Sequence, residues 1–129
     1  MIENLSKEQL EGIFEAIPVE ISFVDENDQV KFWNKHKTRI FQRPISVIGK
    51  SVQNCHPKQS LDKVDQILFD FKSGKRDSAE FWIDLKGRKL YIRYFAVKDK
   101  TGKYLGTLEA TQDITEIKKI EGERRLLQY

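Results

Sequence analysis

The side chains best suited to chemistry are those of the adjacent residues Cys55 and His56. A cysteine thiolate and a histidine imidazole are both ligands that bind haem iron and other transition metals. An isolated cysteine, however, commonly behaves as a small buried hydrophobic residue, and a lone histidine commonly serves as a loop or capping residue. We therefore interpret this pair as structural and keep His56 as an alternative haem ligand.

Little else in the chain offers catalytic or metal-binding chemistry. There are one cysteine and two histidines, and no acidic motif stands near them at metal-ligand spacing. Neither of the glycine-rich phosphate-binding patterns, GxGxxG or GxxxxGK followed by Ser or Thr, occurs. The sequence therefore predicts no catalytic residue, no metal site apart from the haem alternative, and no enzymatic activity.

Length and composition favour one domain, because 129 residues lie below the size at which chains usually divide. The single cysteine excludes an internal disulfide framework and indicates a reducing, cytoplasmic location. The net charge of +3 comes from basic residues scattered among nearly as many acidic ones, so we expect no nucleic-acid partner. No apolar run approaches the roughly 20 residues of a membrane-spanning helix, so we expect no membrane partner.

Two amphipathic helices are predicted. Ser6 and Gln9 have capping-box spacing, and an apolar stripe follows before Pro18, so residues 1–17 form an N-terminal amphipathic helix. The stripe consists of Leu10, Ile13, Phe14 and Ile17. A second helix begins at Ser60 or Asp62 and ends at Gly74, with a stripe of Val64, Ile67, Leu68 and Phe71. A short helix capped by Asn34 is expected over residues 35–41.

Five strands are predicted around these helices. Apolar and polar residues alternate on both sides of the turn at residues 25–28, which indicates a first hairpin. Three further strands are expected over 79–85, 89–98 and 104–112, separated by short hairpin connections. Strands dominate the end of the chain and helices its middle, which is typical of an α+β fold.

The last strand runs through Asp113-Ile-Thr115 into a charged segment that we expect to form a C-terminal helix over residues 116–129. Asp113 and Thr115 are suited to cap the first turn of this helix and so to fix the angle at which it leaves. Its seam of Ile117, Ile120, Arg124 and Leu127 is short, and Gly122 weakens the helix by about 1 kcal/mol. We therefore expect this helix to pair with a partner helix or with the apolar stripe of the N-terminal helix.

Three motifs resemble those of PAS domains in order and spacing: Phe32-Trp-Asn34, Ile48-Gly-Lys-Ser51, and Gly106 together with Asp113-Ile-Thr115. The resemblance covers residues 18–115. It implies a PAS-like five-stranded antiparallel sheet with short helices folded over one face, flanked by the N-terminal helix and a C-terminal exit helix. It also implies a sensory module whose exit helix carries the signal.

Other segments look like a bacterial PAS subgroup found C-terminal to hemerythrin-like domains, namely residues 49–57, 71–75 and 79–83. This resemblance implies that the chain is one module of a longer protein. Asn54-Cys55 is superficially similar to the photoactive motif of flavin-binding light sensors, but His-Pro-Lys follows in place of the flavin-gripping run. A photoreceptor is therefore not expected.

The ligand pocket implied by this fold has eight candidate residues: Phe32, Cys55, His56, Ile67, Phe71, Ile92, Tyr94 and Leu108. Most are apolar with a few polar groups, as in small-molecule sites; the alternative is that they simply fill the core. The sequence does not specify a cofactor, and the options are none, haem or flavin.

We predict a PAS-type sensory module that binds a small ligand or partner and relays its state through its terminal helices. Asp113 and Thr115 form the signal junction. A homodimer is expected through Leu10, Ile13, Phe14, Ile117 and Ile120. One alternative is a ligand-free dimerisation or docking module, and a second is a haem or flavin redox sensor.

Overall fold

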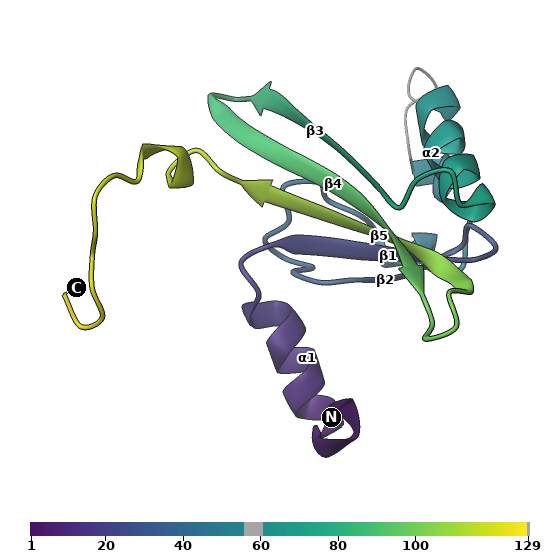
Figure 1. Cartoon of the computed structure of the whole chain (residues 1–129), viewed down its shortest axis with the longest axis horizontal. Coiled ribbons are helices and arrows are strands. Elements are labelled where there is room, and N and C mark those ends of the chain that lie inside the picture. The colour runs from purple at the N-terminus through teal and green to yellow at the C-terminus, as the bar shows by residue number, and fades with distance from the viewer. Residues whose placement is uncertain (56–60, 129) are drawn as a thin grey trace.

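A five-stranded antiparallel sheet forms the centre of the fold (Figure 1), and its strand order is β2-β1-β5-β4-β3. The computed structural model describes residues 1–55 and 61–128. The strands are β1 (Glu20–Asp25), β2 (Val30–Trp33), β3 (Ser78–Leu85), β4 (Arg88–Lys98) and β5 (Tyr104–Asp113). All five predicted strands are confirmed, and the last three begin and end within one residue of the predicted bounds.

Two α-helices flank this sheet, α1 (Lys7–Ala16) and α2 (Leu61–Ser73). The predicted capping box of α1 is present, because Ser6 Oγ accepts from the Gln9 backbone and Gln9 Oε1 accepts from the Ser6 backbone. In Figure 1, α2 lies against the sheet, whereas α1 projects away from it. The described residues also form short 3-10 helices: η1 (Ile2–Asn4), η2 (Ile45–Val47), η3 (Val52–Cys55) and η5 (Ile117–Lys119). Among the described residues, no helix is long and apolar enough to cross a membrane.

Strand pairing divides the sheet into two faces. Ser22 lies opposite Glu109, and Glu109 lies opposite Tyr94, so these three side chains share the face that α2 covers, which we call the α2 face. The core on this face contains Val24, Val30, Trp33, Val52 and Leu68. Phe71, Leu90 and Ile92 are also buried there. The opposite face carries Phe23 and Leu108, which are paired in the ladder between β1 and β5.

Asn34, at the end of β2, holds the N-terminal helix to the sheet. Its side chain is fully buried, accepts a hydrogen bond from the Ile21 backbone, and donates to the carbonyls of Phe14 and Val19 at 2.7 and 3.0 Å. A buried amide must satisfy its polar atoms in this way to avoid a large desolvation cost. The Phe32-Trp-Asn34 motif thus has a structural role.

Gly106 of β5 is required by a close approach of the backbone. Its φ angle is 153°, and a Cβ at this position would lie 2.2 Å from the Val24 carbonyl and 2.6 Å from the Phe23 ring. No side chain fits that space, so the glycine of the third motif is explained by contact between β5 and β1.

The structure corrects two predicted helices. Residues 35–41 form turns and irregular chain instead of a helix. The predicted exit helix over 116–129 is reduced to the single turn η5, after which Ile120 is extended and Gly122 and Leu127 have positive φ angles. Fourteen residues with an internal glycine and a short apolar seam are too few for a stable helix without a partner, since isolated helices shorter than about 12–15 residues are marginal.

Candidate functional site: a cavity between the sheet and α2

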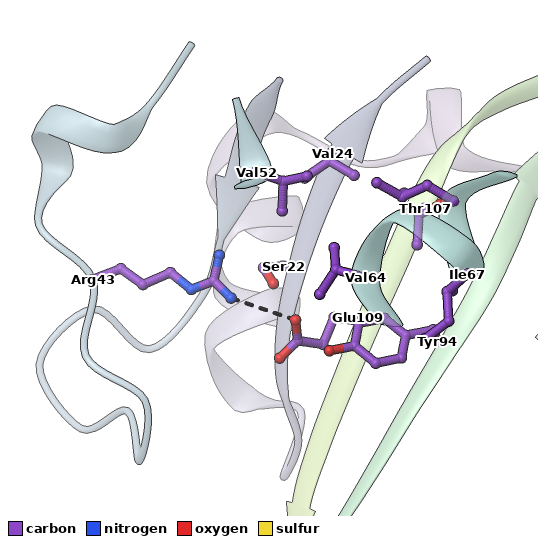
Figure 2. A pocket seen from close by; sticks show the side chains of 10 residues that line it. Ser22, Val24, Arg43, Val52, Val64, Ile67, Tyr94, Thr107 and Glu109 are labelled. Atoms are coloured by element: carbon purple, nitrogen blue, oxygen red, sulfur yellow. Dashed lines mark hydrogen bonds and ion pairs between the residues drawn. The ribbon is translucent and has the colours of Figure 1, made fainter. Parts of the chain in front are cut away.

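A cavity of about 30 Å³ lies between the α2 face of the sheet and α2 itself (Figure 2). Its volume suffices for one or two water molecules. Ten residues from β1, β4, β5, α2 and the segments before α2 line it: Ser22, Val24, Arg43, Val52, Val64, Ile67, Leu68, Tyr94, Thr107 and Glu109. An apolar wall with a few convergent polar groups is the usual composition of a small-molecule site.

Arg43 and Glu109 form an ion pair at the rim of this cavity, with 3.4 Å between the guanidinium and the carboxylate. Their side chains are 11% and 13% exposed. Figure 2 shows the Tyr94 hydroxyl pointing toward the same carboxylate. Burial and the negative charge of Glu109 raise the pKa of Tyr94, so the phenol stays protonated and remains a hydrogen-bond donor.

A second ion pair on the same face, Arg39 with Glu20, is more deeply buried, with side chains 1% and 4% exposed. The Glu20 carboxylate accepts from the backbone N–H groups of Ile40 and Phe41 at 2.7 and 3.2 Å, as well as from Arg39 at 3.4 Å. Arg39 donates to three backbone carbonyls, those of Ile21, Asn34 and Phe41, at 2.9–3.1 Å. Burial lowers the pKa of Arg39, and the charge of Glu20 opposes that effect. This pair fixes the loop that carries Arg43.

The predicted pocket residues divide into four groups of two. Ile67 and Tyr94 line the cavity, and Phe71 and Ile92 are buried on the same side of the sheet without lining it. Phe32 and Leu108 instead lie on the opposite face, where Phe32 packs against Phe14 with 5.1 Å between ring centroids. The side chain of Cys55 and the whole of His56 lie outside the described residues.

Four polar cavity residues were missed: Ser22, Arg43, Thr107 and Glu109. Alternation in β1 and β5 does not reveal these residues, because one face of an antiparallel sheet is often exposed to solvent and carries the polar residues. The signal that was available is that apolar residues occupy both alternating sets, for example Val24 beside Phe23. Among the described residues, no group of three His, Cys, Asp or Glu side chains could hold a metal ion.

The Asp113-Ile-Thr115 triplet closes β5 with several hydrogen bonds. Asp113 accepts from the Thr115 backbone and hydroxyl at 3.0 and 2.6 Å, and from Arg88 at 2.7 Å. The Thr115 hydroxyl oxygen in turn accepts from the Lys89 backbone at 2.8 Å. The hydrogen bonds from Arg88 and Thr115 lower the pKa of Asp113 to about 2. In this structure the two residues tie the end of β5 to β4, and they cap no α-helix.

The five residues predicted for a dimer interface differ in exposure. Ile13, Ile117 and Ile120 are 44%, 48% and 74% exposed. Leu10 is half-buried, and Phe14 is half-buried through its contact with Phe32. Three of the five are therefore accessible to a partner in the single chain.

The described residues form an α+β domain with one sheet and a small cavity between that sheet and α2. The family profile described as PAS domain matches residues 10–115. The chain belongs to the PAS domain family. A comparison with functionally curated proteins found no match.

Solved structures agree with this assignment. A C-terminal domain from Streptococcus mutans is 34% identical, with 91% of each chain covered and a TM-score of 0.85. The PAS domain of BvgS from Bordetella pertussis is 18% identical, with 87% of this chain and 88% of that chain covered and a TM-score of 0.63. A sensory box sensor histidine kinase from Vibrio cholerae is 12% identical, with 82% and 89% covered and a TM-score of 0.59. The last two show similarity of fold alone.

Proposed function

We propose that this PAS domain is a non-catalytic sensory module that binds a small ligand in the cavity and relays its state through its terminal segments. One observation carries the proposal: β5 contributes both to the cavity and to the junction. Thr107 and Glu109 line the cavity, and the same strand ends at Asp113, whose side chain holds the start of the C-terminal segment. A ligand that displaces Glu109 would act on a strand whose end lies a few residues away.

Such a switch requires that the ligand bind one conformation more tightly than another. At the junction, Arg88 and Lys89 hold the end of β5 from the neighbouring strand by side-chain and backbone hydrogen bonds. Release of these bonds would free residues 116–128, which are mostly exposed, to pair as a helix with a partner.

Mass spectrometry of the freshly purified protein, under native and denaturing conditions, tests the proposal. A small molecule lost on unfolding would support a ligand-binding module. Hydrogen exchange would then compare the liganded and stripped protein, and we expect a change at residues 113–120 together with the cavity strands. Exchange that changes only around the cavity would contradict relay through the junction.

A ligand-free dimerisation module is the second candidate, and the exposed side chains of Ile13, Ile117 and Ile120 favour it. These apolar groups would be removed from water in a homodimer, which stabilises association. Sedimentation would show a dimer that Ile13→Asp dissociates, with no retained small molecule. A monomer at high concentration whose state Ile13→Asp does not alter would remove this candidate.

We further propose that the chain is one module of a longer cytoplasmic protein, of the kind in which a PAS domain follows a hemerythrin-like domain. The sequence segments quoted above support this closer placement, and the single cysteine supports the location. Haem or flavin remains the cofactor alternative, and it predicts a coloured preparation.

A further inference from the structure

The cavity has two walls of different chemistry. Residues of α2 and neighbouring segments make the apolar wall, which includes Val52, Val64, Ile67 and Leu68. The facing wall is mostly polar: it contains Ser22, Arg43, Tyr94, Thr107 and Glu109, together with apolar Val24. Figure 2 shows the Arg43–Glu109 pair and the Tyr94 hydroxyl gathered at one side of the space. An occupant would therefore need one polar edge and one apolar edge.

The Arg43–Glu109 contact is loose for two groups so far removed from water. Its 3.4 Å exceeds the roughly 2.7–2.9 Å of a good charge-assisted hydrogen bond. The Tyr94 hydroxyl also points toward the Glu109 carboxylate, and the hydrogen bond that this carboxylate accepts from the Thr111 hydroxyl is 3.5 Å long. In the described part of the chain, Arg43 donates only to Glu109. Buried charges need close partners, so both groups retain capacity for a further hydrogen bond.

The charges of the pair also decide which occupants are excluded. A carboxylate ligand placed here would lie against the negative charge of Glu109, and an ammonium ligand would lie against Arg43. Like charges at such distances are costly in a site with little water. A neutral molecule meets neither penalty, and it can bond to both partners when it presents an acceptor beside a donor.

We propose that the cavity binds small neutral molecules with an amide-like edge, whose carbonyl accepts from Arg43 and whose adjacent N–H donates to Glu109. The proposal rests on the proposed sensory function and names the ligand class of that site. The apolar part of the ligand packs against Val64 and Ile67. The cavity of about 30 Å³ holds only one or two water molecules, so binding of a small ring or short chain requires the cavity to widen and Arg43 and Glu109 to separate, with the amide edge between them.

Titrations of the ¹⁵N-labelled full chain, followed by NMR, test this class with four probes of similar size. These are 2-pyrrolidinone, which has both groups; cyclopentanone, which lacks the N–H; butyrate, an anion; and cyclopentylammonium, a cation. We expect 2-pyrrolidinone to shift the backbone signals of Ser22, Thr107 and Glu109 and to bind at least about tenfold more tightly than cyclopentanone, because Glu109 loses a donor in the second case.

Tighter binding of butyrate or cyclopentylammonium would overturn the ligand class while leaving small-molecule sensing intact. Absence of binding by all four probes would also overturn it. A different result would contradict the proposed function itself: no small molecule retained by the purified protein or by protein exposed to cell extract. The two failures are therefore distinguishable.

Glu109→Gln separates a role of Glu109 in ligand selection from a purely structural role, because only the first predicts a change in ligand preference. It leaves the positive charge of Arg43 without its counter-ion, so we expect the preference to reverse in favour of butyrate. Glu80→Gln is the matched control, because it makes the same change in net charge on β3, outside the cavity lining. It should keep the preference for 2-pyrrolidinone. Equal preferences in the two variants would contradict the assignment of Glu109.

Discussion

Two arginine–carboxylate pairs lie on the same face of the sheet, yet their surroundings differ. The Glu20–Arg39 pair is surrounded by short hydrogen bonds to backbone groups and is almost fully buried. The Arg43–Glu109 pair has the same 3.4 Å separation, but it has no comparable hydrogen bonds to the backbone among the described residues, and it borders a cavity. Residue type alone therefore does not separate a structural ion pair from an adaptable one, meaning a pair that can rearrange to bind a ligand. What separates them is how completely each charged group is satisfied by its neighbours.

Breaking the Glu20–Arg39 pair is expected to have the largest effect on stability. Arg39→Met leaves the Glu20 carboxylate buried without its counter-ion and removes donors from three carbonyls, so we expect a loss of about 3–5 kcal/mol in the free energy of unfolding. Urea denaturation measures it. Arg43→Met, the matched substitution in the other pair, should cost about 1–2 kcal/mol, because it removes one long hydrogen bond and leaves no backbone carbonyl of the described residues without its donor. Equal losses in the two variants would erase the distinction.

Asn34→Ala tests the hydrogen bonds of the Asn34 side chain, which lie next to the Glu20–Arg39 pair. It leaves the Ile21 N–H and the carbonyls of Phe14 and Val19 without their partner, so we expect a loss of about 2–3 kcal/mol. Ser22→Ala, which removes a hydroxyl from the cavity wall, should cost less than about 1 kcal/mol. Thermal or urea denaturation of both variants measures the two losses. A larger loss for Ser22→Ala than for Asn34→Ala would contradict this prediction.

Double-mutant cycles sharpen the difference between the pairs. We expect a coupling free energy above about 2 kcal/mol between Glu20 and Arg39, and below about 1 kcal/mol between Arg43 and Glu109. Glu→Gln and Arg→Met substitutions, alone and combined, provide the four unfolding free energies for each cycle. Coupling that is stronger at the cavity would show that the surrounding backbone hydrogen bonds are a poor guide to the energy of a pair.

A third charged cluster, at the end of β5, differs from both pairs because it lies nearer the surface. The pKa of Asp113 is lowered from 3.8 to about 2 in the folded state, so its carboxylate stabilises the fold above pH 4. This contribution is lost as the pH falls from about 4 to about 2. Asp113→Asn should therefore be less stable than the wild type near pH 6, and the gap should close over that interval.

Urea midpoints measured between pH 2 and pH 6 follow this gap. Arg88→Met is the companion variant, because it removes the first cause of the lowered pKa and should leave the pH dependence partly reduced. A gap that is constant with pH would mean that the Asp113 hydrogen bonds are not formed in solution.

The sheet could be predicted from the sequence because period-two alternation and turn residues reflect local backbone physics. Ser6 and Gln9 likewise predicted the start of α1 through a local cap. The exit helix could not be predicted in the same way, because a short segment with Gly122 depends on a partner for stability. Local propensity therefore predicted the sheet and the start of α1. It did not predict the C-terminal segment, whose helix depends on association with a partner.

The site was harder to predict than the framework. Phe32 and Leu108 were predicted to line the pocket as apolar residues, but they lie on the face of the sheet opposite α2. In fact both faces of the sheet carry partly buried residues, and charged Glu109 points to the α2 side. Its partner Arg43 comes from an irregular segment 66 positions away, and no periodicity links the two. Such pairings become visible only in three dimensions.

The most direct test of the central claim observes both arginines in one sample. The Nε–Hε signals of Arg39 and Arg43, assigned in the ¹⁵N-labelled wild-type protein, would be followed during addition of 2-pyrrolidinone. We predict that the Arg43 signal shifts and saturates while the Arg39 signal stays in place. Equal shifts of both signals, or no shift of the Arg43 signal, would contradict the division into a structural pair and an adaptable pair.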